Sequence, residues 1–377
     1  MAFFSAPFRP FFFLTALSAV LIPMYFVCIV INEYPFPGEL INSFAWHGHE
    51  MVFGFTSALL TGFLLTASAK WTGRPTFKDG ELALLVLSWV IARVVIFFQP
   101  NMLLVLFIVP IPLCLLLIKM FIILKGSRNF IPITLILFVL LSSELMLLYG
   151  ASVNDSELVT KSYKIAAMAI YILLFIFSGR LITFFTNSRF KKELVSLNSR
   201  AEIITFTTIL SSFLLYIFDY EKAELYFCII ALLLMIYRGI KLFSKEVFKE
   251  KMLIILVVAH SWLVLFFGVR IINILNPDIS DGQSSFHALF AGALATFAIG
   301  IMARASLGHS GRKIESSFFI NCSFISLTLG ALVRVLTPLF TGNVFNWLLH
   351  FSMGFWTLGF IFFLIKFTPI YLKKRAS

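Results

Sequence analysis

Residues 46–69 read WHGHEMVFGFTSALLTGFLLTASA, and this stretch indicates whether the chain folds in water or in a lipid bilayer. After two histidines and one glutamate near its start, it contains only apolar, aromatic and small residues. At a rise of 1.5 Å per residue, a helix of this length covers roughly 36 Å, enough to cross a hydrocarbon core of about 30 Å. The stretch therefore predicts a transmembrane helix with ionisable residues close to one end.

The rest of the chain has the same character. Hydrophobic residues make up 60% of its 377 residues, charged residues make up 13%, and the mean hydropathy is +0.98. Soluble domains contain about 45–50% apolar and about 25% charged residues. The composition therefore excludes a water-soluble fold and predicts the lipid bilayer as the partner of most of the surface.

Twelve apolar windows are long enough to span a membrane. They are residues 11–31, 46–69, 81–98, 101–124, 131–151, 162–186, 203–219, 224–243, 252–274, 285–307, 318–340 and 344–368. The first window resembles a signal peptide, but no small-residue cleavage pattern follows it, so we expect a retained helix. The windows predict an all-α, polytopic bundle of about twelve helices, organised as a single integral membrane domain over residues 1–377.

The connectors between the windows alternate in charge. Those after the even-numbered windows are basic, at residues 70–78, 125–128, 189–200, 245–251 and 304–313. The opposite connectors are acidic or mixed, at residues 33–39, 155–164, 219–224 and 278–281. Because basic loops stay in the cytoplasm, we expect both termini to be cytoplasmic and the protein to lie in the inner membrane of a bacterium. The net charge of +12 thus indicates orientation, with no nucleic-acid partner.

The second and tenth windows look like copies of one unit. His49 precedes Arg74, and His287 precedes Arg312, by the same 25 residues (74−49 and 312−287). In this register Gly54 matches Gly292. Membrane proteins often build a site where such repeats meet.

The repeated histidines are candidate haem ligands. His49 and His287 each lie about 5 Å inside the outer end of a predicted helix, at the matched depth needed to bind haem iron from both axial sides. The alternative is that they are interfacial histidines bonded to loops. Small residues on both helices leave room for a flat macrocycle, or only let the helices approach each other. They are Gly54, Ala58, Gly62, Ala291, Gly292 and Ala295.

Two neighbours of His49 extend this candidate site. His47 is two residues away and so points about 200° around the helix, which means that one histidine binds a metal while the other orients a partner or serves a second metal. Glu50 is placed to accept the remaining ring N–H of a ligating histidine, or else to handle protons.

Other ionisable residues lie deeper or farther along the chain. His260 and His350 are candidate copper ligands, since imidazole suits copper, or else bond to a helix carbonyl. His309 belongs to a cytoplasmic turn. Arg270 and Arg334 fall in outer halves of helices, where an arginine fork suits the haem propionates. The four cysteines show no paired spacing, which argues against disulfides and a cysteine metal site.

Several of these motifs resemble the NnrS family. They are Arg9-Pro10-Phe11-Phe12, Trp46 to Phe55, Gly62 to Ala67, Trp71 to Pro75, Gly179-Arg180, and His287 through Arg312. The family is described as bacterial membrane proteins that contain haem and copper and act in nitric oxide metabolism and resistance to nitrosative stress. The resemblance covers most of the chain and implies haem b, with or without copper, and nitric oxide or a related small nitrogen species as a ligand. Its matching histidines are His47, His49, His260, His287 and His309.

A second likeness is architectural. Haem-copper oxidase core subunits also have twelve helices with haem ligands on the second and tenth. No His-His pair or His-x-x-x-Tyr motif occurs in the sixth to eighth windows, so an oxidase oxygen centre is not expected.

Three hypotheses follow. The favoured one is a haem protein, with His49 (or His47) and His287 as axial ligands, that senses, handles or removes nitric oxide. The alternatives are a secondary transporter with buried charges such as Glu144 and no cofactor, or an assembly partner of a respiratory complex. The sequence decides neither an enzymatic reaction nor the oligomeric state.

The predicted orientation has a direct test. A green fluorescent protein fused after Ser377 should fluoresce, because green fluorescent protein becomes fluorescent in the cytoplasm. Alkaline phosphatase fused at the same position should be inactive, because it is active only outside the cytoplasm. The opposite pattern would place the C-terminus outside and overturn the orientation.

Overall fold

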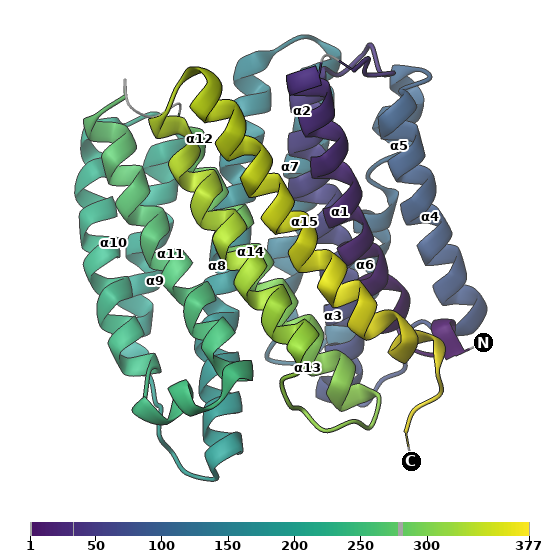
Figure 1. Ribbon diagram of the computed structural model, residues 1–377, viewed down its shortest axis with the longest axis vertical. Helices are drawn as coiled ribbons and strands as arrows, with labels where there is room; N and C mark the ends of the chain where they lie inside the picture. Colours follow the sequence, from purple (N-terminus) through teal and green to yellow (C-terminus); the bar gives the residue numbers. More distant parts are fainter. Residues whose placement is uncertain (1, 33, 278–281, 377) are drawn as a thin grey trace. The chain divides into compact units, whose positions relative to one another are not determined.

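The computed structural model describes residues 2–32, 34–277 and 282–376, and every regular element in these ranges is a helix (Figure 1). Helix accounts for 83% of the structure. The predicted all-α class is therefore confirmed. Glu33 and residues 278–281, which belong to two of the predicted outer connectors, lie outside the described residues.

Fifteen α-helices are found in this part of the chain. Their bounds are Phe8–Asn32 (α1), Ser43–His49 (α2), Phe55–Thr72 (α3), Asp79–Phe98 (α4), Met102–Ile108 (α5), Ile111–Leu124 (α6), Phe130–Ser152 (α7), Ser156–Phe190 (α8), Ser199–Ile217 (α9), Glu221–Leu242 (α10), Lys251–Leu275 (α11), Gln283–His287 (α12), Ala295–His309 (α13), Phe318–Leu336 (α14) and Gly342–Leu372 (α15). A π-helical segment, Glu50–Gly54, joins α2 to α3, and another, Ala288–Leu294, joins α12 to α13.

These helices form twelve segments, within the described ranges, that are long and apolar enough to cross a membrane. The predicted polytopic bundle of about twelve helices is confirmed. Its orientation, its internal repeat and its organisation as one domain remain predictions.

The short connector between the third and fourth spans is built around Gln99. This residue ends α4 in the left-handed conformation, with φ of +47°. Its buried side chain accepts hydrogen bonds from the backbone amides of Leu40 and Ile41, at 2.8 and 2.7 Å. Asn101 then caps α5 by accepting the amide of Leu104. Residues 99–101 therefore suffice to connect α4 to α5, because the side chains of Gln99 and Asn101 accept hydrogen bonds from backbone amides.

The chain divides into two compact units. The first consists of Met1–Ala166, Met302–Lys313 and Phe360–Ser377, and the second of Ala167–Ile301 and Ile314–Gly359. Helices α8, α13 and α15 thus contribute residues to both units.

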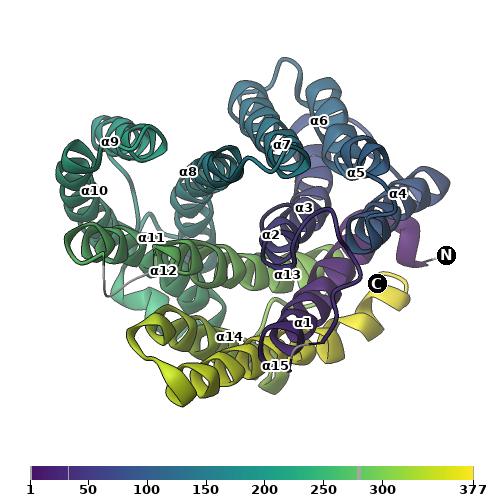
Figure 2. The ribbon, with the colours of Figure 1, turned by 90° about the horizontal axis from the view of Figure 1, so that it is seen from above.

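In the first unit, α3 packs against α1 and α6, and α6 packs against α4 and α7 (Figure 2). The contact between α1 and α3 depends on Gly62. A Cβ atom at this position would lie 2.8 Å from the ring of Phe12, closer than a Cβ normally approaches another heavy atom. Small residues allow such close packing in membranes, where lipid tails are as apolar as the helix surfaces.

In the second unit, α9, α10 and α11 lie side by side in chain order (Figure 2). Helix α11 also packs against α12 and the following π segment, and these in turn contact α14. An ion pair joins two of these helices. Arg238 of α10 binds Glu202 of α9 through two donors, at 2.8 and 2.9 Å.

The role of Gly62 can be tested by overpacking. We expect Gly62→Leu to lower the melting temperature, because added atoms in a packed interface cost about 1–3 kcal/mol. The matched control is Gly268→Leu, since the space around Gly268 in α11 is open. Thermal unfolding in detergent measures both variants. Equal melting temperatures for the two would contradict the packing role.

Candidate functional site

The candidate residue with the most polar contacts is His49, at the end of α2. Its side chain is fully inaccessible and lies between two carboxylates. Nδ1 is 3.1 Å from Oε1 of Glu50, and Nε2 is 3.1 Å from Oε1 of Glu144, which comes from α7. Both ring nitrogens of His49 are therefore engaged by protein side chains.

Arg93 of α4 extends this chain of polar contacts. Its Nη1 donates to Oε1 of Glu50 over 2.7 Å, and its guanidinium lies 5.4 Å from the ring centre of Trp89. We call Arg93, Glu50, His49 and Glu144 the His49 network. It joins α4, α2 and α7 inside the first unit.

The net charge of the His49 network follows from its ionisable groups. Two carboxylates and one guanidinium leave one negative charge, which a proton on His49 or on a carboxylate neutralises. Only the imidazolium form presents N–H donors to both carboxylates at once. Oε2 of Glu144 is buried and has no hydrogen-bond partner among the described residues. The network can thus hold an exchangeable proton in a setting where unpaired charge is costly.

Two glycines near His49 leave space for side chains from other helices. A Cβ at Gly54 would collide with the guanidinium of Arg93, and one at Gly48 would collide with the hydroxyl of Tyr163. That hydroxyl donates to the carbonyl of Ala45 over 3.0 Å. The glycines of the sequence 46–55 therefore receive side chains from other helices.

The backbone beside His49 is π-helical, and so is the backbone beside His287. Glu50–Gly54 follows His49 directly, and Ala288–Leu294 follows His287 directly. π-Helical turns are rare and occur frequently at functional sites. In the first unit, Trp89 Nε1 donates to the Gly54 carbonyl over 3.1 Å, which helps to satisfy a carbonyl of the irregular turn. Both predicted axial residues thus lie at an interruption of regular helix.

The small residues on these helices do not border open space. Gly54 faces Arg93, Gly62 faces Phe12, and Gly292 of the second unit faces the indole of Trp262. The room expected for a flat macrocycle is filled at these positions by side chains. Close helix approach, the alternative interpretation, accounts for these glycines.

His47 does not join the His49 network. Its ring stacks on Phe26 of α1, with ring centres 4.0 Å apart and planes 11° apart. The divergence expected from the two-residue spacing therefore separates the histidines, so that His49 faces carboxylates and His47 faces an aromatic ring.

His287 and His350, in the second unit, have a similar arrangement. Nδ1 of His287 lies 2.9 Å from the carbonyl of Gln283, and Nδ1 of His350 lies 2.8 Å from the carbonyl of Asn346. A carbonyl only accepts, so Nδ1 is the donor in both contacts. Metal-ligating histidines are commonly oriented in this way.

The remaining histidines contact aromatic rings. His260 is fully buried, with Nε2 3.4 Å from the carbonyl of Met235 and its ring perpendicular to that of Phe243. Its Nδ1 has no hydrogen-bond partner in the described part of the chain. His309, in the first unit, ends α13 with its ring centre 5.6 Å from that of Phe8.

The two candidate propionate partners differ in their surroundings. Arg270 already donates to Glu224 through Nε and Nη2, at 2.6 and 2.9 Å, and lies over the ring of Tyr216. Glu224 therefore already engages one edge of this guanidinium. Arg334 is half-buried in the last turn of α14.

Sequence reasoning named Glu144 only as a buried charge and did not connect it with His49. The available signal was a carboxylate inside an apolar window, which requires a partner. Within the described ranges, no group of three or more His, Cys, Asp or Glu side chains has the arrangement of a metal site.

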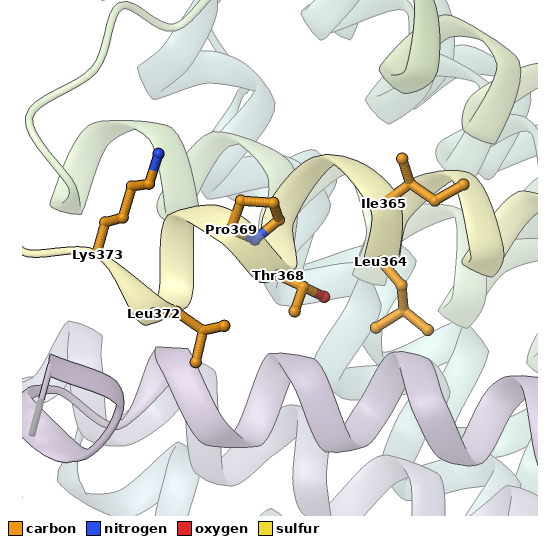
Figure 3. Close-up of a pocket in the computed structure, with 6 residues that line it drawn as sticks. All are labelled: Leu364, Ile365, Thr368, Pro369, Leu372 and Lys373. Carbon is orange, nitrogen blue, oxygen red and sulfur yellow. The ribbon is translucent and has the colours of Figure 1, made fainter.

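One shallow hollow lies on α15 in the first unit (Figure 3). Its lining contains no histidine and consists of Leu364, Ile365, Thr368, Pro369, Leu372 and Lys373. It is therefore separate from the candidate cofactor residues.

The coupling within the His49 network can be measured by a double-mutant cycle. His49→Ala and Glu144→Ala should be non-additive by about 0.5–3 kcal/mol, because each removes the other's partner. The control pairs His49→Ala with Glu224→Ala, which shares no partner with it and should be additive. Unfolding free energies in detergent give both values, and additivity in the first cycle would contradict the network.

Comparison with known proteins gives one match. A family model described as NnrS protein matches residues 2–375. No curated protein matches the chain. Since the matched region covers nearly the whole chain, this multi-pass membrane protein belongs to the NnrS family.

Proposed function

We propose that this protein is a haem b protein of the bacterial inner membrane, with or without copper, that acts in nitric oxide metabolism or resistance to nitrosative stress. The observation that carries the proposal is the family match over residues 2–375, since the family is linked to the nitric oxide response. Its candidate axial ligands are His49 and His287. A haem would supply binding and redox chemistry for a small nitrogen species.

The second unit contains histidines with the orientation that is common among metal ligands. Nδ1 of His287 donates to the Gln283 carbonyl. His350 is oriented in the same way and is a candidate for copper, as is His260. Arg270 and Arg334 are the candidate propionate partners, and Arg270 also donates two bonds to Glu224.

His49 fits a metal only after one of its contacts is exchanged. Glu50 accepts from one ring nitrogen, as a carboxylate behind a ligating histidine does. Glu144 occupies the other nitrogen, Nε2, and would have to release it. The role of Glu144 would then be to hold His49 until the cofactor binds. His47, stacked on Phe26, is the alternative ligand on this helix.

Optical spectra of the purified protein test this proposal. The wild-type protein should show a Soret band and the pyridine haemochrome of haem b. His49→Ala and His287→Ala should each reduce the band, and the double variant should lack it, whereas His309→Ala should retain it. A colourless wild-type protein, or an unchanged band in the double variant, would overturn the proposal.

The second candidate function is secondary transport, and the His49 network favours it. Buried charges that can hold a proton are common in proton-coupled transporters. A metal-free preparation that moves a solute in liposomes, with loss of transport in Glu144→Gln, would decide for this alternative.

A further inference from the structure

One end of the first unit gathers positive charge around the C-terminal tail. The main-chain amide of Ala376 donates to the Ser310 carbonyl over 2.9 Å, so the tail is held against the turn that follows α13. Arg312 is within electrostatic range of Arg9, and Lys70 and Arg375 are within range of His309. Together with Lys373, the Lys and Arg residues of this group are called the basic end: Arg9, Lys70, Arg312, Lys373 and Arg375.

The described residues supply no carboxylate counter-ion to the basic end. Among the described residues, none of its members forms an ion pair with a carboxylate. Like charges held close together repel one another unless an anion lies between or beside them. This arrangement therefore calls for an external anion.

Arg9 fixes the position of Lys373. Arg9 is buried, and its Nη1 donates to the carbonyls of Tyr371 and Lys373, at 2.8 and 2.6 Å. The hydroxyl of Tyr371 in turn lies 2.7 Å from Oγ of Ser306. The main chain at the end of α15 is thus anchored, while the Lys373 side chain remains exposed.

The hollow on α15 begins at this lysine. Its walls are mainly apolar, and Figure 3 shows Leu364 and Leu372 pointing toward the pale purple helix α1, with Lys373 and Pro369 on the other side. Pro369 lies within α15 and has no amide to bond to the Ile365 carbonyl, which locally disturbs the helix. From Leu364 to Lys373 the hollow covers roughly 14 Å along a membrane-spanning helix.

From this combination we propose that the hollow and the basic end bind an anionic phospholipid. One acyl chain lies along Leu364, Ile365 and Leu372, and the headgroup phosphate is held by Lys373 with help from Arg375 of the basic end. A soluble anion would use the charges but not the apolar wall, and a zwitterionic lipid would use the wall but leave the positive charge unbalanced. The proposal is independent of any haem.

Native mass spectrometry of the full-length protein tests this. In micelles containing equal amounts of phosphatidylglycerol and phosphatidylcholine, the protein should retain phosphatidylglycerol preferentially. Lys373→Ala should lower its retention about fivefold, the effect of one lysine near an anionic surface. The matched control is Lys374→Ala, which changes an exposed neighbour that does not line the hollow and should leave retention unchanged.

A second variant separates the acyl chain from the charge. Thr368→Trp should fill the hollow without altering any charge and should also lower phosphatidylglycerol retention. Melting temperatures in lipid-free detergent show that each variant is folded. Equal retention of the two lipids, or equal effects of Lys373→Ala and Lys374→Ala, would overturn the proposal. So would displacement of the lipid by inorganic phosphate alone, which would indicate a simple anion site.

Discussion

Charge pairing inside an apolar bundle is the constraint on which the internal arrangement of each unit depends. Hydrocarbon offers neither water nor counter-ions, so an ionisable side chain within it needs a protein partner. His49 meets Glu144 across 95 residues of sequence, and Arg270 meets Glu224 across 46. Such contacts select specific neighbours among helices whose apolar faces are otherwise interchangeable, because lipid satisfies an apolar face as well as another helix does.

Glycine and the π segments make these pairs possible. Where Arg93 passes Gly54, its guanidinium can reach Glu50 because the glycine has no side chain in the way. The π segment that begins at Glu50 interrupts the regular helix where His49 and Glu50 must both turn inward. The same interruption follows His287 in the second unit, where a backbone carbonyl orients the histidine ring. His49 and His287 are thus both followed by a π-helical segment, but their described hydrogen-bond partners differ.

Arginine performs a different task at the basic end. Arg9 donates to the last carbonyls of α15, and Arg74 donates to the carbonyls of Ile122 and Ile123 near the end of α6, both at 3.1 Å. Helix C-termini lack intrahelical donors for their last carbonyls and carry partial negative charge, which a cation complements. Basic residues such as Arg74 and Arg9 therefore also bind the ends of helices. The exposed members of the basic end are the charges that we propose bind the phospholipid.

Hydropathy alone was sufficient to predict the twelve spans, because each span must be continuously apolar regardless of its neighbours. The family followed from sequence motifs such as Trp46 to Phe55. The positions of His49 and His287 near the start of their spans also followed from the sequence. The pairing of His49 with Glu144 did not, since a contact between α2 and α7 depends on which helices pack together. Nor did the filling of Gly54 and Gly62 by Arg93 and Phe12: a small residue indicates close approach, but only the tertiary structure decides what approaches. Sequence determined where polar groups enter the membrane, and packing decided which partner satisfies each of them.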